Sequence, residues 1–271
     1  MTESPIFDQN KIKTMAKADI FKKAPKTGYD EPAVEIDRTE FIKTVESRRS
    51  VRVFTDEKVA PEDMEQCLEL ALMAPNSSNL QPWEFYWVKD EEKKEKLKAY
   101  CLGQPAAATA QELVVCVARL DTWKQNNKRM LEFFSQTEER VPKSALQYYK
   151  KLVPIVYNQG PFGITGLIKR IAVFFMGLKQ PTPRQPVSHS DMRVWAHKSA
   201  ALGCENLMLA LRAFGYDSCP MEGIDSKRIQ KLLELPTSAE ICMVVSAGKR
   251  ASNGIYGKRI RFDKDLFIKK V

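Results

Sequence analysis

Residues 74–83 read Ala-Pro-Asn-Ser-Ser-Asn-Leu-Gln-Pro-Trp and separate the clearest helix signal of the chain from an aromatic strand signal. Asparagine, serine and glutamine side chains set between two prolines offer directional hydrogen-bonding groups on a stiff backbone. Loops of this kind are typical of small-molecule sites, which concentrate on loops held by a rigid scaffold. A solvated surface turn is the competing interpretation of the same residues.

The segment before this loop predicts an amphipathic helix. Pro61 suits the first helical turn, and Pro75 ends the helix. Apolar residues recur between them at i, i+3, i+4, i+7 and i+8, namely Met64, Cys67, Leu68, Ala71 and Leu72. The segment after the loop, residues 83–89, has the aromatic and β-branched content of a strand.

The rest of the chain predicts more helices than strands. Further helices are expected after Asp37, over about 90–101, from Met192 to Phe214 with Gly215 ending it, and from about Asp225 to Leu235. The apolar runs 113–117 and 241–245 predict strands buried on both faces. A turn is expected from Asp217 to Gly223.

These elements place the chain in the α+β class, with helices flanking a small sheet. Two or three helices are expected in residues 122–190, which we interpret as an excursion from the main fold. The predicted organisation is an N-terminal arm over residues 1–37, then a single domain over residues 38–271 that includes the excursion.

Composition limits the function classes. The chain has 271 residues and is 44% hydrophobic, which excludes disorder as its main state. Its net charge of +9 suggests an anionic partner, either nucleic acid, a membrane surface or a phosphorylated cofactor. The six cysteines lack metal-ligand spacing, which indicates reduced thiols and a cytoplasmic protein.

A transmembrane segment is not expected. The most apolar stretch, Phe162 to Leu178, is interrupted by Lys169 and Arg170 and is shorter than the ~20 residues that a spanning helix needs. The start of the chain carries no basic-then-apolar signal segment. Residues 163–178 leave open a helix that lies on a membrane surface, because Lys179 adds a third cation.

Several common catalytic motifs are missing. The chain has no G-x-x-x-x-G-K-[ST] phosphate loop, no G-x-G-x-x-G motif and no G-x-S-x-G motif. His189 and His197 are its only histidines and make a poor metal site, so no metal is expected. An enzyme without these groups can take its chemistry from a bound cofactor.

Three further segments carry chemical signal. Arg48-Arg49-Ser50-Val51-Arg52 sets guanidinium groups at a helix end, where they suit phosphate or ring carbonyl acceptors. Residues 220–224 read Pro-Met-Glu-Gly-Ile, and Gly223 permits close approach of a flat ligand or a positive φ. The basic tail holds Lys249, Arg250, Lys258, Arg259 and Arg261. Taken singly, these segments are a helix end, a turn and a solubilising or nucleic-acid-binding tail.

In collinear order, the motifs R-R-S-V-R-x-F, A-P-N-S-S-N-x-Q-P-W-x-F and P-M-E-G-I-D and the basic tail resemble the nitroreductase family of FMN-dependent oxidoreductases. The resemblance covers roughly residues 38–120 and 192–262. It departs from the simplest family pattern at Asn76, where a second serine is common, and in the length of the excursion.

The resemblance implies an interlocked homodimer with a central, mostly antiparallel sheet and two FMN molecules at the subunit interface. Arg48, Arg49, Ser50 and Arg52 would hold the phosphate, ribityl chain and pyrimidine edge. The partner subunit would contribute the residues Pro75, Asn76, Ser77 and Asn79. The turn toward flavin N5 would hold Pro220, Met221, Glu222 and Gly223, with Gln104 at the ring edge. Arg259 and Arg261 would reach the phosphate, with Lys258 as an alternative register of the tail. No side chain is expected to act as a catalytic group, because flavin N5 carries the chemistry.

The implied activity passes hydride from NADH or NADPH through flavin N5 to a small-molecule acceptor of nitroaromatic, quinone or enone type, by a ping-pong mechanism. The alternatives are a specialised flavin-dependent dehalogenase or dehydrogenase on the same fold, or a basic protein that binds nucleic acid or a membrane surface. Nucleic acid is not expected as a partner, because aromatic residues do not interleave with the basic runs. The excursion residues 160–164, Tyr148, Tyr149 and 174–176 are expected to line a substrate pocket or to cover a dimer surface.

Overall fold

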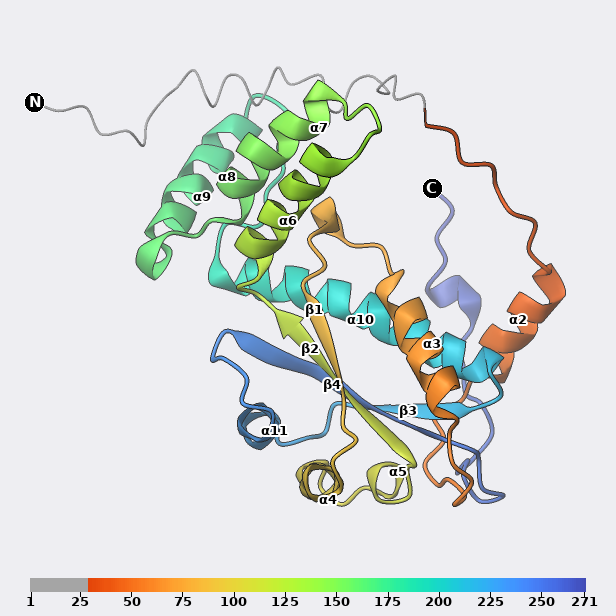
Figure 1. Ribbon diagram of the computed structural model, residues 1–271. Coiled ribbons are helices and arrows are strands. Elements are labelled where there is room, and N and C mark those ends of the chain that lie inside the picture. Colours follow the sequence, from red (N-terminus) through yellow and green to blue (C-terminus); the bar gives the residue numbers. More distant parts are fainter. Residues whose placement is uncertain (1–28) are drawn as a thin grey trace, which may run out of the picture. The chain divides into compact units, whose positions relative to one another are not determined.

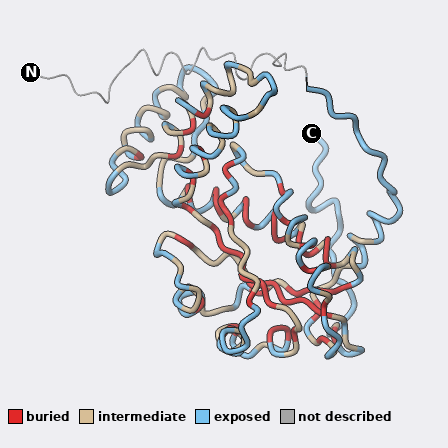
Figure 2. Tube along the Cα trace, in the orientation of Figure 1, coloured by how far each residue is buried: buried red, intermediate tan, exposed pale blue. Residues whose placement is uncertain are grey.

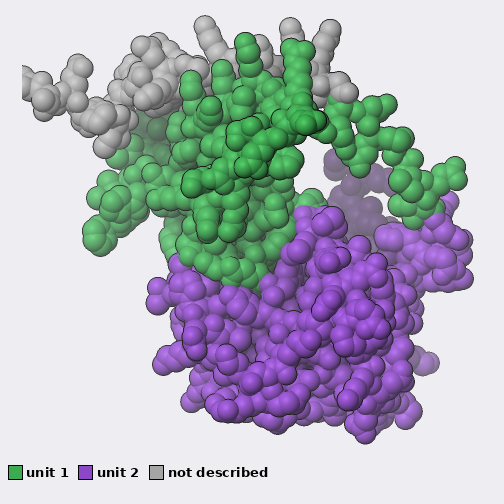
Figure 3. All heavy atoms as spheres, viewed as in Figure 1, with its two compact units in different colours: residues 1–36, 75–84, 118–200 green, residues 37–74, 85–117, 201–271 purple. Residues whose placement is uncertain are grey.

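The computed structural model describes residues 29–271, and the chain divides into two compact units (Figure 3). The sheet unit comprises residues 37–74, 85–117 and 201–271. The described part of the helical unit comprises residues 29–36, 75–84 and 118–200. The predicted arm lies mostly outside the described residues, and its described part, residues 29–37, is exposed and has no regular structure.

A four-stranded sheet in the order β1-β2-β4-β3 organises the sheet unit (Figure 1). Its strands are β1 (Trp83–Trp87), β2 (Glu112–Arg119), β3 (Asp217–Met221) and β4 (Ala239–Gly248). Strands β3 and β4 are antiparallel, with Asp217 opposite Gly248 and Met221 opposite Val244. The α+β class with an antiparallel sheet is therefore confirmed.

The turn expected over residues 217–223 is wrong for most of its length. Residues 217–221 form β3, and only the residues after Met221 leave the sheet. Asp217 and Pro220 are poor strand formers by themselves. The strand forms because its backbone pairs with β4 along its whole length, and because Cys219 and Met221 are buried.

Side chains of β2 alternate between two hydrophobic cores, as the period of a strand requires. Leu113, Val115 and Val117 join one core, and Val114 and Cys116 join the other. The expectation of a strand buried on both faces is confirmed. Figure 1 shows α4 (Glu91–Tyr100), α5 (Pro105–Ala108) and α11 (Ser226–Leu232) on one side of this sheet, and α3 (Pro61–Leu72) and α10 (His189–Ala213) on the other.

Four helices of the sheet unit agree with the sequence pattern to within a few residues, namely α2 (Arg38–Ser47), α3 (Pro61–Leu72), α4 (Glu91–Tyr100) and α11 (Ser226–Leu232). The short helix α5 (Pro105–Ala108) is not expected from the sequence. Helix α3 buries Met64, Cys67 and Ala71, as its apolar stripe predicts. Helix α2 begins at the cap Asp37, whose Oδ1 accepts from the Thr39 amide at 2.7 Å, but buries none of its residues.

The longest helix, α10 (His189–Ala213), begins three residues before the predicted start at Met192. Gly215 follows it with a φ of +82°, a left-handed conformation that glycine adopts without strain. The tail after β4 has little regular structure, apart from a short 3₁₀ turn η5 (Lys264–Leu266).

The excursion contains more helices than expected. They are α6 (Trp123–Gln136), α7 (Lys143–Gln147), a π-helical turn η3 (Tyr148–Leu152), α8 (Val153–Tyr157), a 3₁₀ turn η4 (Pro161–Gly163) and α9 (Ile164–Gly177). Aromatic rings organise the core of the helical unit. The ring of Tyr157 lies 4.7 Å from that of Trp195 and 6.2 Å from that of Trp123, measured between centroids. Figure 2 shows the buried stretches of these helices in red.

Candidate functional site

The arginine segment after α2 lies against β3 in the sheet unit. The Val51 amide donates to the Ser218 carbonyl oxygen at 3.0 Å, and Ser50 and Ser218 form an isolated parallel bridge. The Arg52 amide donates to the Gly254 carbonyl oxygen at 2.7 Å. The first arginine motif, the strand that leads into the third motif, and the basic tail are therefore brought together.

The tail is fastened to the end of α2 by its own arginine. Arg259 Nη2 donates to the carbonyl oxygens of Glu46 and Arg48, both at 2.6 Å. In the opposite direction, Arg49 Nη2 donates to the Gly257 carbonyl oxygen at 2.6 Å. These reciprocal bonds hold the tail segment beside the arginine motif.

Positive charge accumulates where the arginine segment 48–52 meets the tail around Arg259, a region that we call the junction. Partial loss of hydration, followed by the charges of Arg261, Arg49 and Arg48, lowers the pKa of Arg259 from its usual value. Within the described residues, none of the five predicted arginines forms an ion pair with a carboxylate. A group of guanidinium groups without acidic partners is suited to a dianion such as a phosphate ester.

A buried hydroxyl at the same junction has no partner. Ser218 is 1% exposed, and its Oγ makes no hydrogen bond. The neighbouring thiol of Cys219 has a raised pKa because it is buried, although Arg52, Arg48 and the Ser50 hydroxyl act in the opposite direction. A buried polar group left unpaired is uncommon and marks a place where a ligand atom can complete the hydrogen bonding.

Gln104 and Gly223, which are both predicted site residues, are in contact. Gln104 Nε2 donates to the Gly223 carbonyl oxygen at 2.8 Å and to the Cys101 carbonyl oxygen at 2.9 Å. Glu222 and Gly223 are exposed in the turn after β3, whereas Met221 is buried in the strand. Gly223 has no positive φ, so that reason for a glycine at this position is wrong. Close approach of a ligand to its backbone stays a prediction.

The loop residues Pro75, Asn76, Ser77 and Asn79 belong to the helical unit. Three residues of this segment adopt positive φ although none is a glycine, namely Ser78 (60°), Asn79 (46°) and Gln81 (44°). Such conformations are costly and cluster at functional sites. The Asn76 Oδ1 supports them by accepting from the Gln81 amide at 2.8 Å.

Three tyrosines of the excursion bind the two serines of this loop. Tyr157 lies 3.0 Å from both Ser77 Oγ and Ser78 Oγ, and Tyr148 lies 2.6 Å from Ser78 Oγ, measured from each tyrosine hydroxyl. Tyr149 donates to the Ser78 carbonyl oxygen at 2.9 Å. Burial raises the pKa of Tyr157, while the hydrogen bonds from both serines lower it. Hydrogen bonds with three tyrosines therefore hold the loop in its conformation, and the sequence did not predict these contacts.

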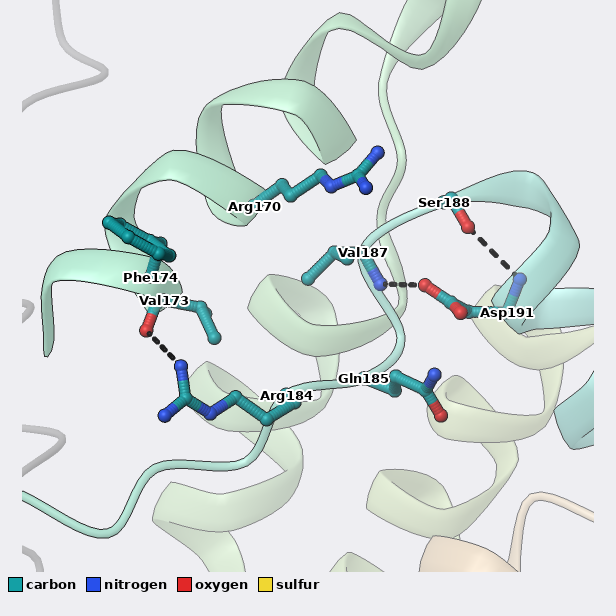
Figure 4. Close-up of a pocket in the computed structure, with 8 residues that line it drawn as sticks. All are labelled: Arg170, Val173, Phe174, Arg184, Gln185, Val187, Ser188 and Asp191. Atoms are coloured by element: carbon teal, nitrogen blue, oxygen red, sulfur yellow. Dashed lines mark hydrogen bonds between the residues drawn. The ribbon is translucent and has the colours of Figure 1, made fainter. Parts of the chain in front are cut away.

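A cavity of about 330 Å³ opens beside α9 in the helical unit (Figure 4). Its lining includes Arg170, Phe174 and Arg184, together with Val187 and Asp191. Of the excursion residues expected to line a substrate pocket, only Phe174 lines this cavity. The tyrosine pair supports the loop, and a role of these excursion residues at a substrate pocket or a dimer surface stays a prediction.

Expectations from the sequence also concern cysteines, metal sites and membrane-spanning helices. All six cysteines are free thiols, five of them buried. In the part of the chain that the structure describes, no group of histidine, cysteine and carboxylate side chains could hold a metal ion. Among the helices of that same part, none is both long and apolar enough to cross a membrane.

Two residues of the junction were not singled out from the sequence. Ser218 precedes the third motif directly, but a hydroxyl in a strand carries no distinguishing pattern. Tyr256 lies in the tail, and its ring centroid is 5.4 Å from the guanidinium carbon of Arg52. In the sequence, only the closeness of Tyr256 to the tail arginines could have pointed to it. Its stacking with Arg52 is apparent only in the folded chain.

Comparison with known proteins agrees with this geometry. A family model described as the Nitroreductase family matches residues 45–249. Protein DrgA of Synechocystis is 29% identical over 213 residues, which is 78% of this chain and 84% of the relative.

Two solved structures have the same fold. A nitroreductase family protein from Streptococcus pneumoniae has a TM-score of 0.64 at 20% identity, over 85% of this chain and all of that chain. The NADPH:FMN oxidoreductase of Vibrio harveyi, complexed with NAD⁺, has a TM-score of 0.57 at 16% identity, over 85% and 76% of the two chains. With the family model covering most of its length, this chain belongs to the nitroreductase family.

Proposed function

We propose that this protein is an FMN-dependent oxidoreductase that takes hydride from NADH or NADPH and delivers it to a small-molecule acceptor of nitroaromatic, quinone or enone type, in a ping-pong cycle. The observation that carries the proposal is the junction of the sheet unit, where the arginine segment and the tail arginines meet and none of the five arginines has a carboxylate partner among the described residues. Membership of the nitroreductase family and the names of the matched oxidoreductases support the choice of cofactor.

The residues present fit FMN by the chemistry of their donors. Arg48, Arg49, Arg259 and Arg261 would hold the phosphate, because guanidinium groups give charge-assisted, bidentate bonds to phosphate oxygens. Ser218, whose buried hydroxyl is unpaired, is the strand residue that the arginine segment contacts through its backbone. Loss of hydration lowers the pKa of Arg259 most, and the charges of Arg261, Arg49 and Arg48 lower it further; a bound dianion would balance those charges.

Other residues of the chain would orient the ring. When bound, FMN supplies a ring that accepts and returns a hydride. Arg52 would lie at the pyrimidine edge, where a cation stabilises negative charge that develops on the ring. Gln104 holds the Gly223 carbonyl oxygen, so that the backbone N–H groups of the turn keep a constant direction. No side-chain nucleophile is required.

We further propose a homodimer in which Pro75, Asn76, Ser77 and Asn79 face the flavin bound by the partner subunit. The supported loop conformation provides a rigid set of polar groups for that contact. Helix α2 also favours a partner, because Phe41, Ile42 and Val45 are 58%, 40% and 41% exposed on one side of the helix. Apolar side chains grouped in this way are typical of subunit interfaces.

The decisive experiment is reconstitution of the purified full-length protein with FMN and with riboflavin. We expect a bound flavin band near ~450 nm with FMN and binding weaker by at least about tenfold with riboflavin, which lacks the phosphate. Arg49→Ala should reduce this preference for FMN. The matched control is Arg228→Ala, because Arg228 is an exposed arginine paired with Asp225 at 3.0 Å. Equal affinity for the two flavins would contradict the proposal.

The acceptor and the donor are then tested by turnover. The FMN-loaded protein should oxidise NADH or NADPH when a quinone or a nitroaromatic compound is supplied, with the parallel reciprocal plots of a ping-pong cycle. A protein that binds FMN but accepts neither nicotinamide would instead belong with the specialised dehalogenases or dehydrogenases of this fold.

A further inference from the structure

Helix α9 presents its apolar side to the surroundings. Six large apolar residues of this region are between 53% and 69% exposed, namely Ile164, Leu167, Ile171, Phe174, Phe175 and Leu178. At 3.6 residues per turn they occupy an arc of about 100° on the helix. Phe162, one turn earlier, is fully exposed as well. We refer to the six residues as the α9 stripe.

The opposite side of α9 is fastened to the helical unit, so the orientation of the stripe is fixed. Gly166 is buried, and its amide donates to the Gln159 carbonyl oxygen at 3.1 Å. Lys169 Nζ donates to the Val156 carbonyl oxygen at 2.7 Å. From the following loop, Arg184 donates to the Val173 carbonyl oxygen at 3.3 Å, as Figure 4 shows.

Cations flank the stripe on both sides. With about 100° per residue, Arg170 falls just beyond one edge of the stripe and Lys179 just beyond the other, and both are exposed. Within the described residues, Arg170 forms no ion pair or hydrogen bond. Residues 141–190 contain seven lysines and arginines and no aspartate or glutamate, so the whole neighbourhood of the stripe in the sequence is positive.

We propose that the α9 stripe and its flanking cations bind the surface of a lipid bilayer that carries anionic headgroups. The stripe would enter the boundary between headgroups and acyl chains, with Arg170 and Lys179 at the level of the lipid phosphates. Interfacial helices combine these features, namely a wide apolar face with aromatic residues and cations at its edges. Lysine and arginine side chains reach headgroups while their stems lie on apolar surface.

Two alternatives to binding at a bilayer surface, a membrane-spanning helix and a second copy of this chain, agree less well with the same residues. Helix α9 has 14 residues, fewer than the ~20 needed to span a bilayer, so it would lie in the plane of the membrane. A second copy of this chain in a symmetric contact would place the same positive surface against itself, because a two-fold interface uses one patch on both subunits. An anionic bilayer instead complements the charge.

The test is cosedimentation of the full-length protein with phosphatidylcholine vesicles, with and without phosphatidylglycerol. We expect binding to the anionic vesicles only, and weaker binding as salt is raised. Leu167→Ser combined with Phe175→Ser should weaken binding at least about tenfold. The matched control is Phe133→Ser, which removes an apolar side chain that is 61% exposed on α6 of the same unit.

A second pair of variants tests the charge. Arg170→Glu with Lys179→Glu should abolish binding to the anionic vesicles, whereas Lys227→Glu with Lys270→Glu makes the same charge change at exposed positions of the sheet unit and should retain it. Light scattering after gel filtration accompanies both series. Failure of the unsubstituted protein to bind anionic vesicles would overturn the proposal. The proposal would also be overturned if the Leu167→Ser, Phe175→Ser variant bound anionic vesicles normally, or if its only effect were a changed oligomeric state. Because sedimentation does not require flavin, this result is independent of the proposed oxidoreductase activity.

Discussion

Gln104 Nε2 and the carbonyl oxygen of Gly223 are 2.8 Å apart, although 119 positions separate these residues in the sequence. The bond ties the segment before α5 to the turn after β3. The resemblance to the family implies that both residues lie at the flavin ring, and their contact makes them one structural feature. The direction of the turn therefore depends on a side chain from another part of the chain.

Gln104→Ala should loosen that turn. We expect FMN affinity to fall about three- to tenfold, since one net hydrogen bond contributes about 0.5–1.5 kcal/mol. Titration of flavin fluorescence measures the change. Gln111→Ala is the control, because Gln111 Nε2 also donates to a backbone carbonyl, that of Thr55 at 3.0 Å. Its loss should lower stability by a similar amount and leave FMN affinity unchanged. Equal effects of the two variants on FMN would contradict the assignment of Gln104.

Gly254→Ala should disturb the position of Arg52. A Cβ at Gly254 would lie 2.5 Å from the Val53 carbonyl oxygen and 3.0 Å from that of Ala251, both backbone atoms. Because the Gly254 carbonyl accepts from the Arg52 amide, relief of this clash moves the bond. We expect a loss of about 1–3 kcal/mol in the free energy of unfolding and weaker FMN binding. Gly257→Ala is the control, since nothing lies within 4 Å of its added Cβ. Denaturant titrations of both variants decide the matter.

Ser218→Ala and Ser246→Ala should have opposite effects on the protein without flavin. Ser218 Oγ is buried and unpaired, so its removal should leave the free energy of unfolding unchanged or raise it by up to about 1 kcal/mol. Ser246 Oγ is also buried but donates to the Cys219 carbonyl oxygen at 3.2 Å. Its removal should cost about 1 kcal/mol. Thermal unfolding compares them, and a comparable loss in both would mean that Ser218 is already paired.

Helices and strands with a strong local period could be predicted from the sequence. Helix α3 has apolar residues at helical spacing, strand β2 is a short apolar run rich in β-branched residues, and both elements are observed. Strand β3 could not be predicted, because its residues favour a turn and its pairing with β4 involves residues more than twenty positions away. The exposure of α9 could not be predicted from the sequence. Its outward-facing apolar residues form the same pattern as those of a buried helix.

The candidate site divides in the same way. Arginine clusters are visible in the sequence, since charge marks them without knowledge of the fold. The unpaired Ser218 hydroxyl is visible only when its neighbours are in place, because the same residue in another strand would be ordinary. The tyrosine contacts to Ser77 and Ser78 join residues about 70–80 positions apart, and no local pattern predicts them.

Lys169 should make stability depend on pH in the alkaline range. Burial lowers the pKa of its amine from 10.5 to about 8, and the charge of Asp191 only partly offsets this. Between these two values the unfolded chain binds more protons than the folded chain, so stability rises as the pH increases. Below pH 8 both states are protonated, and the destabilising effect of the buried charge is fully present.

Lys169→Met isolates this effect. The free energy of unfolding of the unsubstituted protein, minus that of the variant, should become more favourable as the pH rises from about 8 to about 10. Urea unfolding at several pH values across this range measures the difference. Lys179→Met removes the same charge from an exposed position near the end of α9, and its difference should stay constant. A difference for Lys169→Met that also stays constant would show that its amine is as well hydrated in the folded chain as in the unfolded one, despite its contact with the Val156 carbonyl oxygen.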